Sequence, residues 1–88
     1  MVKLLFFTGS WCIPCKTYLP KVKACCEQHG VQIEIVDVTE RFETANKYNV
    51  KSVPTIMLLD NEKIHYQRSG VMSDDMLNNL IGNADPES

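Results

Sequence analysis

Two cysteines separated by two residues, Cys12 and Cys15, are the part of this 88-residue sequence best suited to chemistry. Residues at positions i and i+3 of a helix bring their Cβ atoms to about 5–6 Å, and a small adjustment lets the two sulfurs bond. A dithiol that closes to a disulfide can exchange a pair of electrons with another disulfide. The spacing therefore predicts a redox-active pair.

The two thiols are expected to have different roles. A break at residues 8–10 precedes a helix that we expect over residues 12–29, with Ser10 as its N-cap. Cys12 then lies where unpaired N–H groups and the positive end of the helix dipole favour a thiolate, which is the nucleophile. Cys15, one turn further in, is expected to be more buried. Cys12 would attack a client disulfide, and Cys15 would resolve the resulting mixed disulfide.

A C-x-x-C pair is also half of a zinc site, so the other possible ligands matter. Cys25 and Cys26 cannot complete such a site, because Cys25 follows Cys15 by ten residues on the same helix, about 15 Å along its axis. His29 and His65 lack the spacing of a zinc finger. We expect no metal and no cofactor, with a metal shared between two chains as the alternative. For Cys25 and Cys26 we expect core packing, with a second redox pair as the alternative.

The composition is typical of one small soluble domain. Apolar residues make up 44% of the chain, and nine Lys and Arg against eleven Asp and Glu give a net charge of −2. The apolar fraction excludes a disordered chain. The slightly negative net charge is unlike the basic surface of a nucleic-acid binder. The longest apolar runs, residues 4–7 and 56–59, are far too short to span a bilayer, and the first residues lack a signal-peptide pattern. We therefore expect a mature cytoplasmic protein that binds neither nucleic acid nor membrane.

Hydrophobic periodicity predicts the elements that position the cysteines. Residues 2–8 indicate a strand buried on both faces, and residues 31–38 indicate a second strand. The helix between them should end at Gly30. Such a βαβ unit pairs its two strands in parallel through a right-handed crossover.

The second half of the chain is expected to complete the sheet. Thr39 should cap a short helix that exits at Asn49 and whose inner face carries Phe42, Ala45 and Tyr48. Residues 55–59 and 63–68 indicate two strands joined by a hairpin at residues 60–62.

Ser73 should cap a last helix that closes at Gly82, which places one domain at residues 1–82 and a polar tail at residues 83–88. The order β-α-β-α-β-β-α predicts an α/β fold, a mixed four-stranded sheet with helices on both faces.

Several segments of the sequence resemble the thioredoxin family. Residues 11–16, W-C-I-P-C-K, resemble its W-C-G-P-C-K signature, with Ile13 in place of glycine. Pro20 matches the family's helix-kinking proline, and Gly70 falls where thioredoxins carry a glycine. The other matching positions are Ala45, Lys47, Tyr48 and the V-P-T segment at residues 53–55. The resemblance covers about residues 2–81 and implies a thioredoxin-like fold.

The resemblance also implies a protein-disulfide reductase with a defined substrate groove. The Val53–Pro54 bond is expected to be cis and to face Cys12, so that the Val53 backbone can hold a client strand by β-augmentation. The groove is expected to consist of Trp11, Ile13, Pro14, Val53, Pro54 and Gly70. The implied partners of this monomer are a thioredoxin-reductase-type flavoprotein and disulfide-containing client proteins, with ribonucleotide reductase among them.

The sequence departs from the family in two places. Thioredoxins begin with an extra strand and helix, whereas this sequence starts at the strand that leads to Trp11, in which it resembles glutaredoxins and small intermediate proteins. Phe6 occupies the position of a buried aspartate that in thioredoxins accepts the proton of the second cysteine, so Cys15 needs another route. Two alternatives stay open: a glutaredoxin-like, glutathione-linked reductase with Lys16 or Lys51 holding a carboxylate, and a thioredoxin-fold binding subunit.

Overall fold

The structure, a computed structural model, describes residues 2–84. Its elements in chain order are β1 (Val2–Thr8), α1 (Ile13–His29), β2 (Gln32–Asp37), α2 (Phe42–Lys47), β3 (Thr55–Asp60), β4 (Lys63–Ser69) and α3 (Asp74–Asn83). The predicted order of elements is confirmed. Most of the predicted polar tail, residues 85–88, lies outside the described residues.

One mixed sheet of four strands, in the order β2-β1-β3-β4, forms the centre of the molecule. β1 pairs in parallel with β2 and antiparallel with β3, and β3 and β4 form an antiparallel hairpin. Asn61 and Glu62 at the hairpin turn both have positive φ, 51° and 72°, as a two-residue type I′ turn requires. The interior position of β1 explains why residues 4–7 are all buried.

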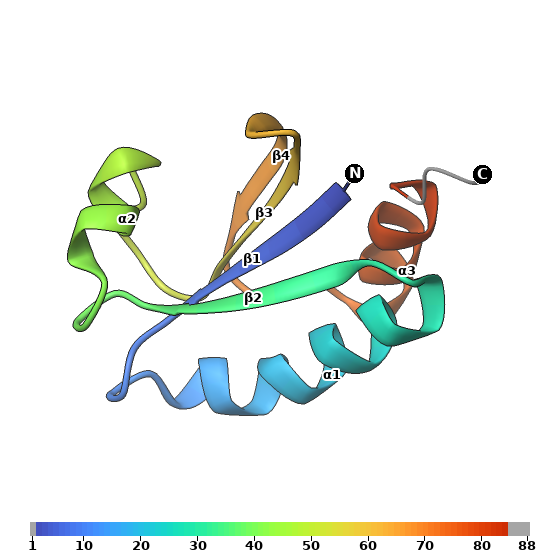
Figure 1. The fold of residues 1–88 in the computed structure, drawn as a ribbon. Coiled ribbons are helices and arrows are strands. Elements are labelled where there is room, and N and C mark those ends of the chain that lie inside the picture. The colour runs from blue at the N-terminus through green and yellow to red at the C-terminus, as the bar shows by residue number, and fades with distance from the viewer. Residues whose placement is uncertain (1, 85–88) are drawn as a thin grey trace.

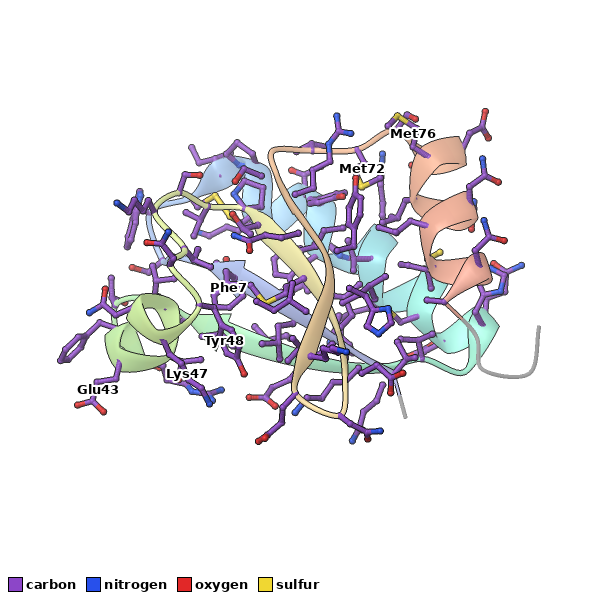
Figure 2. The ribbon with its side chains drawn as sticks, turned by 90° about the horizontal axis from the view of Figure 1, so that it is seen from above. Phe7, Glu43, Lys47, Tyr48, Met72 and Met76 are labelled. Carbon is purple, nitrogen blue, oxygen red and sulfur yellow. A yellow bond between two sulfur atoms is a disulfide. The ribbon has the colours of Figure 1, made fainter. Side chains whose placement is uncertain are left out.

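The helices cover both faces of this sheet (Figure 1). α1 and α3 pack on one face, over Leu4 and Phe6, and α2 covers the other, over Leu5 and Phe7. Successive side chains of a strand point to opposite faces, so β1 supplies both cores. Tyr48, just after α2, contacts Phe7 with a ring-centroid distance of 6.4 Å (Figure 2). None of the described helices has the length and apolar character needed to cross a membrane.

The N-cap of α1 differs from the prediction. Cys12, not Ser10, caps the helix, and its sulfur accepts a hydrogen bond from the Cys15 backbone N–H. An N-cap side chain bonds the N–H of the second or third helical residue. The second is Pro14, which has no N–H. The N–H of Cys15 is the remaining donor, and Cys12 is the residue placed to accept from it.

The prediction for α2 is wrong at its start. Thr39 does not cap this helix, because its hydroxyl and its backbone N–H both bond the Asp37 carboxylate. Arg41 is the N-cap residue and makes no side-chain capping bond. Phe42 is 59% exposed rather than part of the inner face. α2 has six residues, fewer than two turns, and Tyr48 at its far end fills the space against Phe7 instead.

In α3, the predicted cap is confirmed and the predicted end is not. Ser73 accepts a hydrogen bond from the Met76 backbone N–H, as an N-cap does. The helix continues through Gly82 to Asn83. A Cβ on Gly82 would lie 3.2 Å from the His29 ring. Gly82 therefore lets α3 approach the end of α1, which is a packing role rather than a terminating one.

Candidate active site

Cys12 and Cys15 are joined by a disulfide bond at the start of α1, with their Cα atoms 5.3 Å apart (Figure 2). Both residues are buried. The Cys12 sulfur accepts a hydrogen bond from the Cys15 backbone N–H at 3.2 Å. The Cys12 backbone N–H donates a hydrogen bond to the Gly9 carbonyl at 3.0 Å. A thiolate formed at Cys12 on reduction would thus lie at a helix N-terminus and beside an N–H donor, and both stabilise negative charge.

Large apolar side chains flank the disulfide on the surface. Trp11 is 60% exposed and Ile13 is 73% exposed. The Trp11 ring packs over Gly9, where an added Cβ would lie 2.7 Å from ring atoms. Gly9 therefore positions Trp11, a role that the sequence analysis missed when it treated residues 8–10 only as a break. A glycine two residues before an exposed tryptophan is the signal that could have revealed it.

The peptide bond between Val53 and Pro54 is cis, as expected. The Pro54 carbonyl accepts a hydrogen bond from the Gly70 N–H at 2.9 Å. Gly70 has a φ of 86°, in the left-handed region that side chains rarely adopt. This bond places Gly70 directly beside the loop that contains Pro54.

The side chain of Thr55 links the loop before β3 to the end of β4 from inside the protein. Its side chain is buried, and its hydroxyl donates to the Ser52 carbonyl at 2.7 Å. The same oxygen lies 3.2 Å from the Ser69 hydroxyl. The first residue of β3 is therefore bonded both to the loop that contains Pro54 and to the last residue of β4.

Tyr18 connects α1 to the segment after Gly70. Its hydroxyl accepts a hydrogen bond from the Met72 backbone N–H at 3.2 Å, and Met72 lies on the connection between β4 and α3 (Figure 2). The Tyr18 ring is buried and lies 5.8 Å from the ring of Phe6. Burial raises the pKa of Tyr18, and the bond from Met72 partly offsets this. Sequence reasoning missed Tyr18, because helical spacing alone does not reveal its distant partner.

The other two cysteines are free and buried. Burial is the main cause that raises the pKa of the Cys26 thiol to about 12, and the charge of the neighbouring Cys25 adds to it. Burial also raises the pKa of Cys25. The Cys25 thiol donates to the Asn78 side-chain oxygen at 3.1 Å. Both residues pack in the core as expected. Residues 2–84 contain no group of three His, Cys, Asp or Glu side chains that could hold a metal ion.

Comparison with known proteins places this geometry in a family. The model of the thioredoxin family matches residues 2–83. A thioredoxin from Bacillus subtilis is 34% identical over 82 residues, which is 91% of this chain and 79% of that protein. The solved structure of a Halobacterium salinarum thioredoxin variant superposes with a TM-score of 0.89 at 31% identity, covering 96% of this chain and 74% of that one. A Thermosipho africanus thioredoxin gives 0.84 at 28% identity, with 92% and 91% covered.

This chain belongs to the thioredoxin family. Its disulfide occupies the family's active-site position, and the protein is a dithiol–disulfide oxidoreductase that acts through Cys12 and Cys15. The structure represents the oxidised form of this thioredoxin.

In the reduced thioredoxin, the Cys12 thiolate attacks one sulfur of a client disulfide, breaks that bond and releases the first client thiolate, which takes up a proton. Cys15 then loses its proton and attacks the Cys12 sulfur of the mixed disulfide. The second client sulfur leaves as a thiolate and takes up a proton, which balances the proton that Cys15 releases to solvent, and the Cys12–Cys15 bond re-forms. The client gains two electrons and the thioredoxin loses two. Phe6 is fully buried against Tyr18, so no carboxylate at that position takes the proton of Cys15.

Proposed function

We propose that this thioredoxin reduces the disulfides of client proteins with electrons from a thioredoxin-reductase-type flavoprotein. The observation that carries the proposal is the exposure of two large apolar side chains, Trp11 and Ile13, on either side of Cys12. Exposed apolar surface of this kind is typical of a protein contact. A flavoprotein reductase is the usual electron donor of the family.

The client groove in this proposal consists of Trp11, Ile13, Pro14, Val53, Pro54 and Gly70. Within the described chain, no residue forms a hydrogen bond with the backbone of Val53. An unpaired backbone N–H and C=O can receive an extended client strand by β-augmentation. Gly70, which has no side chain and is tied to Pro54, supports a close approach of that strand.

We further propose a cytoplasmic monomer whose clients include ribonucleotide reductase. The free thiols of Cys25 and Cys26 support a reducing compartment, where unpaired cysteines persist. The identity of the client rests on the family resemblance.

Insulin reduction tests the electron donor. The purified protein is supplied either with NADPH and thioredoxin reductase or with NADPH, glutathione and glutathione reductase. We expect turnover with the first system and little with the second. Turnover with glutathione alone would assign the protein to the glutaredoxin-like alternative.

A double substitution tests the binding-subunit alternative. Cys12→Ser combined with Cys15→Ser removes both reactive thiols and leaves the surface nearly unchanged. We expect complete loss of insulin reduction and of complementation in a thioredoxin-deficient host. Complementation by the double variant would show that the surface, not the thiols, supplies the biological activity.

A further inference from the structure

A pocket of about 280 Å³ lies next to the active site and has no assigned role. Trp11 and Val53, from the two segments that flank the disulfide, form part of its wall. Its complete lining is Trp11, Val38, Val50, Lys51, Ser52 and Val53. The volume suits one side chain of a bound polypeptide rather than a whole cofactor.

Lys51 is the single charged residue of this lining. It is exposed, and it forms no salt bridge within the part of the chain that the structure describes. Lys3 and Lys21, by contrast, are paired with Glu34 and Asp74. The Lys51 ammonium group is therefore free to meet a negative charge brought by a ligand.

Asp37, next to Val38, is not part of this lining and forms no salt bridge within the described residues. Its carboxylate accepts hydrogen bonds from the hydroxyl and the backbone N–H of Thr39, and these bonds lower the pKa of Asp37. The walls of the pocket thus offer apolar contact from tryptophan and valine, and its rim offers one positive charge.

We propose that this pocket is a client-specificity subsite that takes a glutamate side chain close to the reducible cysteine of the client. The methylene groups of the glutamate pack against Trp11 and Val53, and its carboxylate meets Lys51. The inference rests on the proposed function, because a client strand along Val53 must pass this pocket to place its sulfur at Cys12. An exposed ion pair of this kind changes a rate by about twofold to fivefold.

Peptide disulfides test the subsite directly. Each short peptide carries one cysteine as a mixed disulfide with thionitrobenzoate, and glutamate, glutamine or lysine is placed in turn at each position beside that cysteine. The pre-reduced protein is mixed with peptide at low salt, and the absorbance of released thionitrobenzoate gives the rate. At one position, we expect glutamate to react about twofold to fivefold faster than glutamine. Salt near 1 M should remove the difference.

Variants of Lys51 and a matched control decide the assignment. Lys51→Ala should abolish the preference for glutamate, and Lys51→Glu should invert it so that the lysine peptide reacts fastest. Lys23→Glu makes the same change in net charge on an exposed position of α1 and should preserve the preference. Equal effects of Lys51→Glu and Lys23→Glu would overturn the proposal in favour of general electrostatics.

The remaining outcomes separate this inference from the function on which it depends. If the wild-type protein reduces glutamate and glutamine peptides at equal rates, the subsite is wrong and the reductase function stands. If it reduces no peptide disulfide, the proposed function itself fails. A Lys51 effect confined to the mixed disulfide of glutathione with thionitrobenzoate would assign the pocket to glutathione and overturn the client subsite.

Discussion

The sulfur of Cys12 accepts a hydrogen bond at 3.2 Å from the backbone N–H of Cys15, so the first cysteine caps the helix that carries the second. Pro14 between them has no N–H to compete for that sulfur. The atom that attacks the client disulfide is thus also the atom that completes the helix terminus. On reduction, the same N–H faces a thiolate and forms a stronger, charge-assisted bond.

Alkylation should distinguish Cys12 from Cys26 in the reduced protein. The helix N-terminus and the Cys15 N–H favour a thiolate at Cys12, whereas burial raises the pKa of Cys26 to about 12. Iodoacetamide at pH 7 should modify Cys12 within minutes and leave Cys26 unmodified until denaturant is added, as peptide mass spectrometry would show. Equal labelling of the two residues in the native protein would contradict both assignments.

Cys15→Ser should convert the enzyme into a trap. Without a resolving thiol, the Cys12 mixed disulfide cannot be released internally, so insulin reduction should fall by about 100-fold or more while a covalent client adduct accumulates. Non-reducing gel electrophoresis measures the adduct. Cys25→Ser is the matched control and should leave turnover unchanged, because the Cys25 side chain points toward α3 and bonds Asn78 there. An adduct that forms equally with Cys12→Ser would refute the assigned order of attack.

Phe6→Asp should destabilise the protein strongly. Phe6 is fully buried against Tyr18, and the substitution leaves a cavity and a desolvated carboxyl, which together cost about 3 kcal/mol or more. Desolvation raises the pKa of a buried carboxyl, so the neutral form is tolerated better. The variant should therefore lose more stability at pH 8 than at pH 4 in urea unfolding. Phe6→Leu, which stays apolar, should show no such difference between the two pH values.

Glu34 should contribute to stability at neutral pH and not in acid. Hydrogen bonds from Lys3 and then Arg41, each with an N–O distance of 2.9 Å, lower the pKa of Glu34. The contribution is present above the ordinary value of about 4.3 and is lost as pH falls through the lower folded value. Because the pairs are partly exposed, Glu34→Gln should cost no more than about 1 kcal/mol at pH 7.

Urea unfolding at pH 7 and near pH 2 measures the effect of Glu34→Gln. The difference from the wild type should shrink at the lower pH, where both proteins carry a neutral side chain at this position. Glu27→Gln, on the exposed face of α1, is the control and should behave alike at both pH values. A Glu34 difference that is independent of pH would assign it to packing rather than charge.

The strands and the redox pair could be predicted because their signals are local. The apolar run at residues 4–7 identified a doubly covered strand, and Gly30 identified the end of α1, where it has a φ of 68°. The spacing of Cys12 and Cys15 was sufficient to predict their bond. Each of these features depends on neighbours within a few positions of the chain.

Features that depend on distant partners could not be predicted in this way. Gly82 looks like a helix terminator in the sequence, but its role is set by the His29 ring on another helix. The role of Tyr18 depends on Met72, and the pocket at Lys51 exists because the loop before β3 folds beside Trp11. The cis bond at Pro54 was expected only through the family resemblance, because no local signal distinguishes it.

The hydrogen bonds around the groove have a consequence for repeated turnover. Three of these hydrogen bonds involve no sulfur atom: Gly70 to Pro54, Thr55 to Ser52, and Met72 to Tyr18. Opening the disulfide breaks none of these bonds, so the groove does not have to be rebuilt in each catalytic cycle. We therefore expect the oxidised and reduced protein to present a similar groove, so that a client or a reductase distinguishes them by sulfur chemistry rather than by shape.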